Sequence, residues 1–117
     1  MSLTDTPSGL PEAQYNAAIQ SALARIESTV DKWLEDDLID IDTARSGGML
    51  TLTLPDRSQL IVNAQPPLQE LWLAARRGGF HFKLNAQGRW LDTRGGEEFF
   101  ELLSLCASEQ GKPGLRF

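Results

Sequence analysis

Cysteine and histidine are almost missing from this sequence, which has one of each, Cys106 and His81, among 117 residues. A single cysteine cannot form an internal disulfide or build a zinc cage, and its rarity indicates a reducing compartment. One histidine leaves little room for Ser-His-Asp or Cys-His catalysis. These shortages favour a non-enzymatic protein of the cytoplasm.

Long apolar runs and clusters of basic residues are missing too. No run approaches the roughly 20 apolar residues that span a bilayer, and residues 1–9 carry Asp5 without any Lys or Arg, unlike a secretion signal or transit peptide. The chain has 11 Lys and Arg against 16 Asp and Glu, a net charge of −5. Because phosphate binding needs clustered bases, we expect neither nucleic acid nor a membrane as a partner.

The negative charge is concentrated between residues 27 and 42. This stretch holds one base, Lys32, and has a net charge of −6, whereas the rest of the chain has a net charge of +1. Its seven acids are Glu27, Asp31, Glu35, Asp36, Asp37, Asp40 and Asp42. Like charges four residues apart destabilise a helix, so the cluster suggests a cationic ligand. Hard metal ions such as Fe²⁺, Fe³⁺, Mn²⁺ or Ca²⁺ fit, and so does a basic protein surface.

Apolar periodicity predicts the fold. Spacings of three and four from Tyr15 to Trp33, widened by Leu23 and Leu34, indicate an amphipathic helix over about 11–35. Alternation and turn residues predict strands at 38–42, 49–54, 59–63, 68–75, 80–84 and 89–92, and a second helix over about 97–109. Segment 68–75 fits helix or strand by pattern, and its Pro-Pro and Gly-Gly flanks favour strand.

These elements predict an α+β fold, a two-layer sandwich in which both helices pack on one face of an antiparallel sheet of about six strands. We expect one domain over residues 11–117, preceded by a flexible lead-in at residues 1–10, which are rich in Ser, Thr, Pro and Gly.

Residues 63–74 and 78–82 carry a distinctive motif. They read Asn-Ala-Gln-Pro-Pro-Leu-Gln-Glu-Leu-Trp-Leu-Ala and Gly-Gly-Phe-His-Phe. The motif resembles the central signature of the frataxin family, most closely the bacterial frataxins of the CyaY type, and the resemblance extends over roughly residues 15–110. It implies an αβ sandwich and a role in iron–sulfur cluster biogenesis. It also implies docking on the cysteine desulfurase and scaffold protein of the assembly machinery by a mostly monomeric protein.

The resemblance further implies weak binding of iron, as Fe²⁺ or Fe³⁺, by the carboxylates of an acidic ridge, here the seven acids of residues 27–42. Bacterial frataxins often carry more acids along the first helix, where this chain has Ser28, Lys32 and Leu34. Lys32 would repel a cation beside Asp31. The expected metal site therefore moves toward the later acids, Glu35, Asp36, Asp37, Asp40 and Asp42, with Asp40 and Asp42 on one face of the strand predicted at 38–42.

Three further residues, Asn63, Gln65 and Trp72, match exposed sheet positions through which the family contacts the assembly machinery, and His81 matches a position near them. We expect Trp72 to be exposed, the alternative being a core tryptophan. His81 alone between apolar neighbours is more typical of a surface residue than of a metal ligand. Cys106 falls on the apolar side of the second helix and is expected to pack in the core.

Three functions remain open at this point. The first is an iron-binding adaptor that regulates cluster assembly on the desulfurase. The second is a regulator that acts only through protein contacts and has incidental iron affinity. The third is an enzyme, a ferroxidase, although such sites usually combine Glu and His in a four-helix core.

Overall fold

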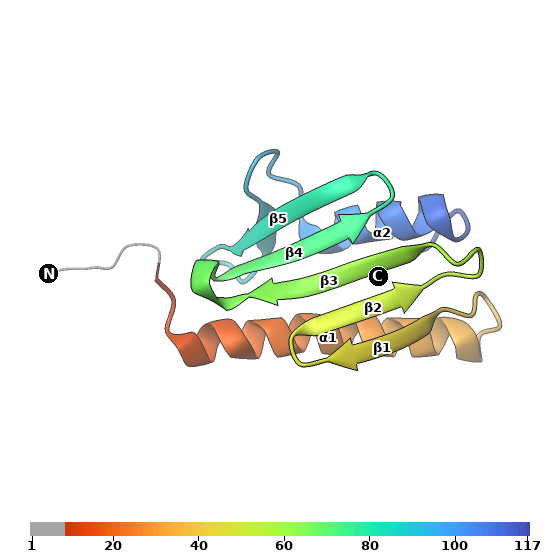
Figure 1. Cartoon of the computed structure of the whole chain (residues 1–117), viewed down its shortest axis with the longest axis horizontal. Helices are drawn as coiled ribbons and strands as arrows, with labels where there is room; N and C mark the ends of the chain where they lie inside the picture. The colour runs from red at the N-terminus through yellow and green to blue at the C-terminus, as the bar shows by residue number, and fades with distance from the viewer. Residues whose placement is uncertain (1–8) are drawn as a thin grey trace, which may run out of the picture.

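The computed structural model describes residues 9–117, in which two helices and six strands follow one another in the order predicted (Figure 1). Helix α1 spans Glu12–Glu35 and α2 spans Phe99–Gln110. The strands are β1 Asp42–Ser46, β2 Met49–Thr53, β3 Gln59–Gln65, β4 Glu70–Ala75, β5 Gly78–Leu84 and β6 Trp90–Asp92, with a short 3-10 helix at Pro66–Leu68.

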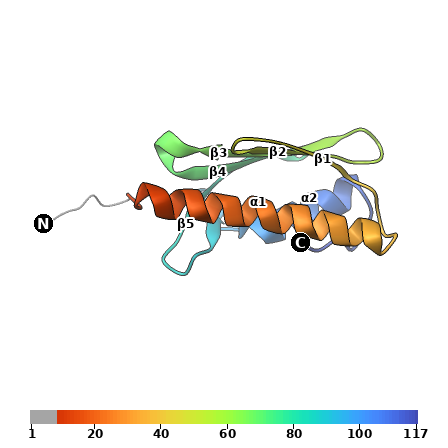
Figure 2. The ribbon, with the colours of Figure 1, turned by 90° about the horizontal axis from the view of Figure 1, so that it is seen from below.

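The strands form one antiparallel sheet in which each strand pairs with its neighbours in the chain, from β1 at one edge to β6 at the other. Both helices lie on the same side of this sheet (Figure 2). The predicted two-layer α+β sandwich is therefore confirmed. The opposite face, called the outer face below, is covered by neither helix.

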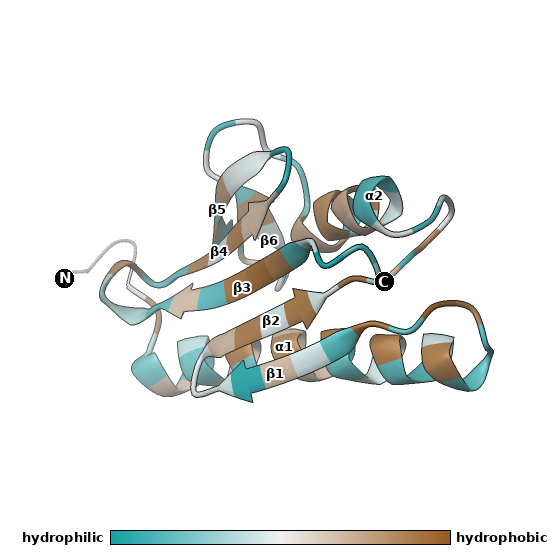
Figure 3. Ribbon diagram, turned by 45° about the vertical axis from the view of Figure 1, so that its right-hand side comes forward, coloured by the Kyte–Doolittle hydropathy of each residue, from teal (hydrophilic) through white to brown (hydrophobic). Residues whose placement is uncertain are grey.

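The core lies between the sheet and the helices. On α1 the predicted stripe is buried, together with Leu23, but Leu34 is 53% exposed. The expectation that Leu34 widens this stripe is wrong, because Leu34 lies in the last turn of α1, where only Trp33 among residues 32–35 is buried. The strands contribute alternate residues, with leucines and valine filling the inner face of β2, β3 and β4. The middle of β3 is hydrophobic and β1 largely hydrophilic (Figure 3).

The prediction of a strand at residues 38–42 is wrong. Residues up to Ile41 form the connection from α1 to the sheet, and β1 begins at Asp42. The two-residue turn Gly47-Gly48 fixes this register, because it pairs Ser46 with Met49 and so places the five residues before the turn opposite β2. The alternation at 38–42 has another cause: Ile41 is buried and Ile39 is partly buried, as anchors of a loop.

Other boundaries also differ, most strand ends by one or two residues. Helix α2 begins at Phe99, and the Glu98 carboxylate caps it by accepting hydrogen bonds from the backbone N–H groups of Phe100 and Glu101. Segment 68–75 is a strand, as predicted, from Glu70 onward, and Leu68 belongs to the 3-10 helix.

Residues 1–8 of the predicted lead-in lie outside the described residues. Leu10 is held at both its N–H and its C=O by the side-chain amide of Gln69, each at 2.8 Å. Among the described residues, neither helix is long and apolar enough to cross a membrane.

Candidate functional site

Three of the four predicted partner-binding residues form a row across the outer face of the sheet. Asn63 of β3 lies opposite Trp72 of β4, and Trp72 lies opposite His81 of β5. Gln65 lies two residues beyond Asn63 on the same face, because strand side chains alternate. The structure therefore brings these four residues together on the face that the helices leave open.

Trp72 is half-buried rather than fully exposed. It lies outside the core, on the outer face, and its indole ring stacks on the His81 imidazole, with the ring centroids 4.1 Å apart and the planes 6° from parallel. The indole Nε1–H donates a 2.8 Å hydrogen bond to the Glu70 carboxylate. The neighbouring side chains thus cover part of the ring and fix its orientation.

Glu70 is a site residue that the sequence analysis missed. It is only 9% exposed, although it lies on the outer face two residues before Trp72. Its carboxylate oxygens lie 3.7 Å from His81 Nδ1 and 3.7 Å from Lys83 Nζ. One signal was available: an acid two residues before a tryptophan on a strand must share the tryptophan's face.

The acids on α1 are partly neutralised by the chain's own bases. Glu27 lies 2.7 Å from the Arg45 guanidinium, which reaches across from β1 and also contacts Gln20. Asp36 pairs with Lys32 at 3.1 Å, one helical turn away. Lys32 thus contacts the acid that follows it by four residues. Asp31 and Glu35, on the same helix, are exposed.

The acids after the helix lie at its C-terminal end and on the following loop. Asp37 adopts a left-handed backbone conformation, with φ of 58°, and its N–H donates to the carbonyl of Leu34. Asp40 lies on the loop and Asp42 starts β1, so they do not share a strand face as predicted. They do line one shallow hollow, together with Arg57 of the β2–β3 turn.

Within residues 9–117, no three acidic, histidine or cysteine side chains gather closely enough to enclose a metal ion. The predicted metal residues are therefore spread over an open surface. Their oxygens are the hard donors that iron accepts, but a geometry of this kind offers only one or two carboxylates to each ion.

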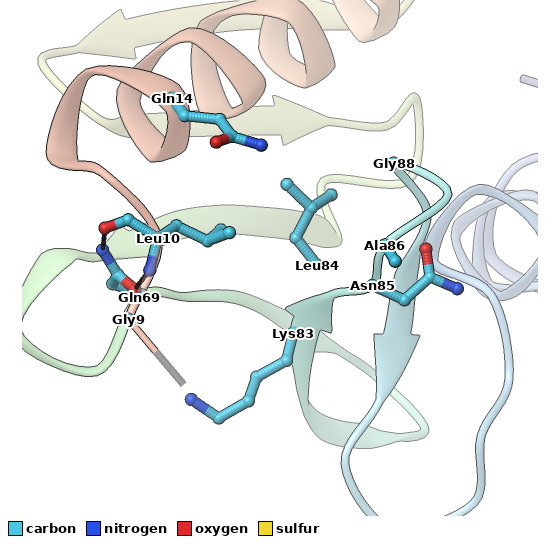
Figure 4. Close-up of a pocket in the computed structure, with 9 residues that line it drawn as sticks. All are labelled: Gly9, Leu10, Gln14, Gln69, Lys83, Leu84, Asn85, Ala86 and Gly88. Carbon is cyan, nitrogen blue, oxygen red and sulfur yellow. Dashed lines mark hydrogen bonds between the residues drawn. The ribbon is translucent and has the colours of Figure 1, made fainter. Parts of the chain in front are cut away.

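A separate hollow of about 410 Å³ lies at the end of the sheet, between Leu10, the start of α1 and the β5–β6 turn (Figure 4). Gln69 and Lys83 line it, and the Gln69 amide is the one that binds the Leu10 backbone. The lining side chains are mostly neutral amides and small apolar groups. They offer no nucleophile paired with a base.

Cys106 packs in the core, as predicted, and is completely buried. Burial raises the pKa of its thiol to about 11, so at neutral pH the group is a protonated thiol rather than a nucleophilic thiolate.

Comparison with known proteins identifies the family. The family model described as a frataxin-like domain matches residues 8–113. A Polaromonas protein named iron-sulfur cluster assembly protein CyaY is 48% identical over 105 residues, covering 89% of this chain and 90% of that protein. A Ralstonia nicotianae protein of the same name is 47% identical over 103 residues, covering 88% and 90% of the two chains.

Solved structures agree with this assignment. The frataxin from Psychromonas ingrahamii superposes with a TM-score of 0.73 at 28% identity, covering 92% of this chain and 97% of that one. Yeast frataxin superposes with a TM-score of 0.71 at 25% identity, covering 92% and 94%. The resemblance seen in residues 63–82 is thus confirmed, and the chain belongs to the frataxin family.

Proposed function

We propose that this protein is a non-enzymatic regulator of iron–sulfur cluster assembly that docks through the outer face of its sheet on the cysteine desulfurase and scaffold of the assembly machinery. The names of its CyaY relatives support the role in assembly. The observation that supports the docking surface is the row Asn63–Trp72–His81, which crosses three strands on the face that neither α1 nor α2 covers. Tryptophan is enriched among residues that dominate binding energy.

The docking proposal is tested by measuring the affinity for purified cysteine desulfurase, with and without scaffold protein, by biolayer interferometry. Replacing Trp72→Ala removes the central aromatic group, and we expect binding to weaken at least about 30-fold, which is typical of a hot spot. Thr53→Ala, on the same face but at the β1 side of the sheet, is the control and should bind like the unmodified protein. Equal affinities for the two variants would overturn the docking surface.

We further propose that iron binds weakly to the exposed carboxylates around the end of α1. Of the seven acids of residues 27–42, five have no ion pair to a basic side chain within residues 9–117: Asp31, Glu35, Asp37, Asp40 and Asp42. Their exposure supports rapid, low-affinity binding. Backbone NMR signals of ¹⁵N-labelled protein would be followed during anaerobic titration with Fe²⁺, with Mg²⁺ as the control. We expect broadening confined to residues 27–42.

Variants of this protein test which carboxylates bind the ion. Asp40→Asn with Asp42→Asn should reduce the broadening near the shallow hollow, whereas Glu12→Gln, an exposed acid at the opposite end of α1, should leave it unchanged. The absence of any localised change at millimolar Fe²⁺ would overturn the iron-binding part of the proposal.

A second candidate function is supported by the ion pairs of the ridge. Glu27 and Asp36 are already paired with Arg45 and Lys32, which leaves less free charge for a metal. A regulator that acts only through protein contacts would use the acids of residues 27–42, Asp36 and Asp37 among them, to attract a basic surface. It predicts that Asp36→Lys with Asp37→Lys abolishes desulfurase binding while Fe²⁺ leaves the affinity of the complex unchanged. Tighter binding in the presence of Fe²⁺ would favour the iron-binding adaptor.

A further inference from the structure

Glu70 is unusual because it is a nearly buried acid on an open face of a sheet. Glutamate is seldom buried unless it is paired, yet this side chain is shielded without any helix above it. The shielding comes from Trp72 on its own strand and from His81 and Lys83 on β5. Trp72–His81 and Glu70–Lys83 are successive cross-strand pairs on one face. The four side chains therefore form a compact square.

Within this square the carboxylate is the common acceptor. One oxygen, Oε1, accepts the 2.8 Å hydrogen bond from the Trp72 indole and lies 3.7 Å from His81 Nδ1. The other, Oε2, lies 3.7 Å from Lys83 Nζ, and the same ammonium donates a 2.8 Å hydrogen bond to the Leu68 carbonyl. Lys83 thereby ties the carboxylate to the chain just before β4. The indole is held at its N–H by Glu70 and at its face by His81.

We propose that Glu70 is a positioning residue, which holds the Trp72 indole in its place beside His81 on the outer face, so that the tryptophan is already in its binding orientation before a partner arrives. A side chain on an open sheet face ordinarily loses rotational freedom when it docks, and that loss weakens binding. Here the hydrogen bond to Glu70 and the stacking on His81 already restrict the rotation of the Trp72 side chain in the unbound protein. This inference rests on the proposed docking surface for its effect on affinity, but the lock itself is a property of the free protein.

The lock is tested first without any partner. The side-chain indole signals of Trp33, Trp72 and Trp90 are recorded in ¹⁵N-labelled protein, with Trp72→Phe used for assignment. In Glu70→Leu, which removes the acceptor at similar size, we expect the Trp72 indole signal to shift and its ¹H–¹⁵N heteronuclear NOE to fall. The Trp33 and Trp90 signals, from residues at least nine-tenths buried, report whether the fold is intact.

Two variants separate the hydrogen bond from the charge. Glu70→Gln keeps an oxygen acceptor without the charge, and should preserve the Trp72 NOE. Lys83→Met removes the neighbouring ammonium but leaves the carboxylate and the indole, and should preserve it too. If Glu70→Leu perturbs the Trp33 or Trp90 signals, Glu70→Ala removes the same acceptor without adding bulk. A Trp72 NOE in Glu70→Leu and Glu70→Ala equal to that of the unmodified protein would overturn the inference.

The consequence for binding is then measured with the desulfurase. We expect Glu70→Leu to weaken binding about 3- to 10-fold, the scale of one side chain's ordering on association, and Glu70→Gln to bind nearly as the unmodified protein does. In a Trp72→Phe background, which lacks the indole donor, Glu70→Leu should have little further effect. A mobile Trp72 with undiminished affinity would overturn the positioning role. If Trp72→Phe and Trp72→Ala both bind normally, the docking proposal fails, and the indole NOE still decides whether Glu70 locks the ring.

Discussion

Removing one hydroxyl group should destabilise the protein measurably. The Tyr15 side chain, on the first turns of α1, is 1% exposed. Its hydroxyl donates to the Glu70 carbonyl at 2.7 Å and accepts from the Gln65 N–H at 3.1 Å. Gln65 and Glu70 are the last pair of the β3–β4 ladder. The hydroxyl therefore bridges the two strands where their own hydrogen bonding ends, and it ties the helix to that corner. Burial raises the pKa of the phenol, which keeps it protonated as a donor.

Tyr15→Phe keeps the ring, and with it the edge-to-face contact with Trp90, but leaves two backbone groups without their partner. An unsatisfied buried polar group costs about 1–3 kcal/mol. Part of this cost is offset because phenylalanine has no hydroxyl group that must lose its water on folding. We expect the free energy of unfolding to fall by about 2 kcal/mol. With a urea m-value of about 1–2 kcal/mol/M, the unfolding midpoint should drop by about 1–2 M.

The assay is urea unfolding followed by circular dichroism at neutral pH. The matched control is Ser28→Ala, which deletes an exposed hydroxyl from the same helix and should change stability by less than about 0.5 kcal/mol. A loss in Tyr15→Phe no larger than that of the control would refute the reasoning, because it would mean that water or direct strand pairing replaces the bridge without cost.

Three further changes test other parts of the fold. Burial raises the pKa of Cys106 to about 11, against 9.0 for an unburied thiol. The unfolded chain therefore loses this proton before the folded protein does, and the free energy of unfolding should fall by about 2–3 kcal/mol as the pH rises from 9 through 11. Urea midpoints at pH 8 and 10.5 should show a smaller alkaline loss in Cys106→Ala, and equal losses would contradict this. Glu98→Ala removes the cap of α2 and should cost about 1 kcal/mol, most of it restored in Glu98→Gln, whereas an unchanged thermal midpoint would count against the cap. Gly111→Ala would place a Cβ 2.9 Å from the Ala107 carbonyl and should cost about 1–3 kcal/mol, whereas Gly79→Ala, with open space around it, should be nearly neutral in the same melts.

The helices were predictable because burial on a helix repeats with its own period. Tyr15 to Trp33 keep this period over about five turns, and the order of elements follows from it and from the turns between the strands. The first strand failed because alternation is not specific to strands. Ile39 and Ile41 anchor a loop, and only the pairing set by the Gly47-Gly48 turn shows where β1 begins.

The candidate site was predictable where a motif marked it and unpredictable where it depends on contacts between distant segments. Asn63, Trp72 and His81, which the motif singled out, lie opposite one another on three neighbouring strands. The pairing of Glu27 with Arg45 joins residues 18 positions apart, from a helix and a strand edge, and nothing local in the sequence indicates it. The spacing of Glu70 and Trp72 indicates that they share a face, but the burial of Glu70 also depends on His81 and Lys83 of the next strand and could not be predicted.

The strand order also bears on how quickly the chain can fold. Every pair in the sheet joins consecutive strands, so each pairing closes only a short loop and loses little chain entropy. The distant contacts include those of the helices, such as Tyr15 with Glu70, which are 55 residues apart. We expect the hairpins to form from neighbouring sequence and α1 to dock afterwards, so refolding should be faster than for β-sandwiches of similar length, whose strands pair across the whole chain.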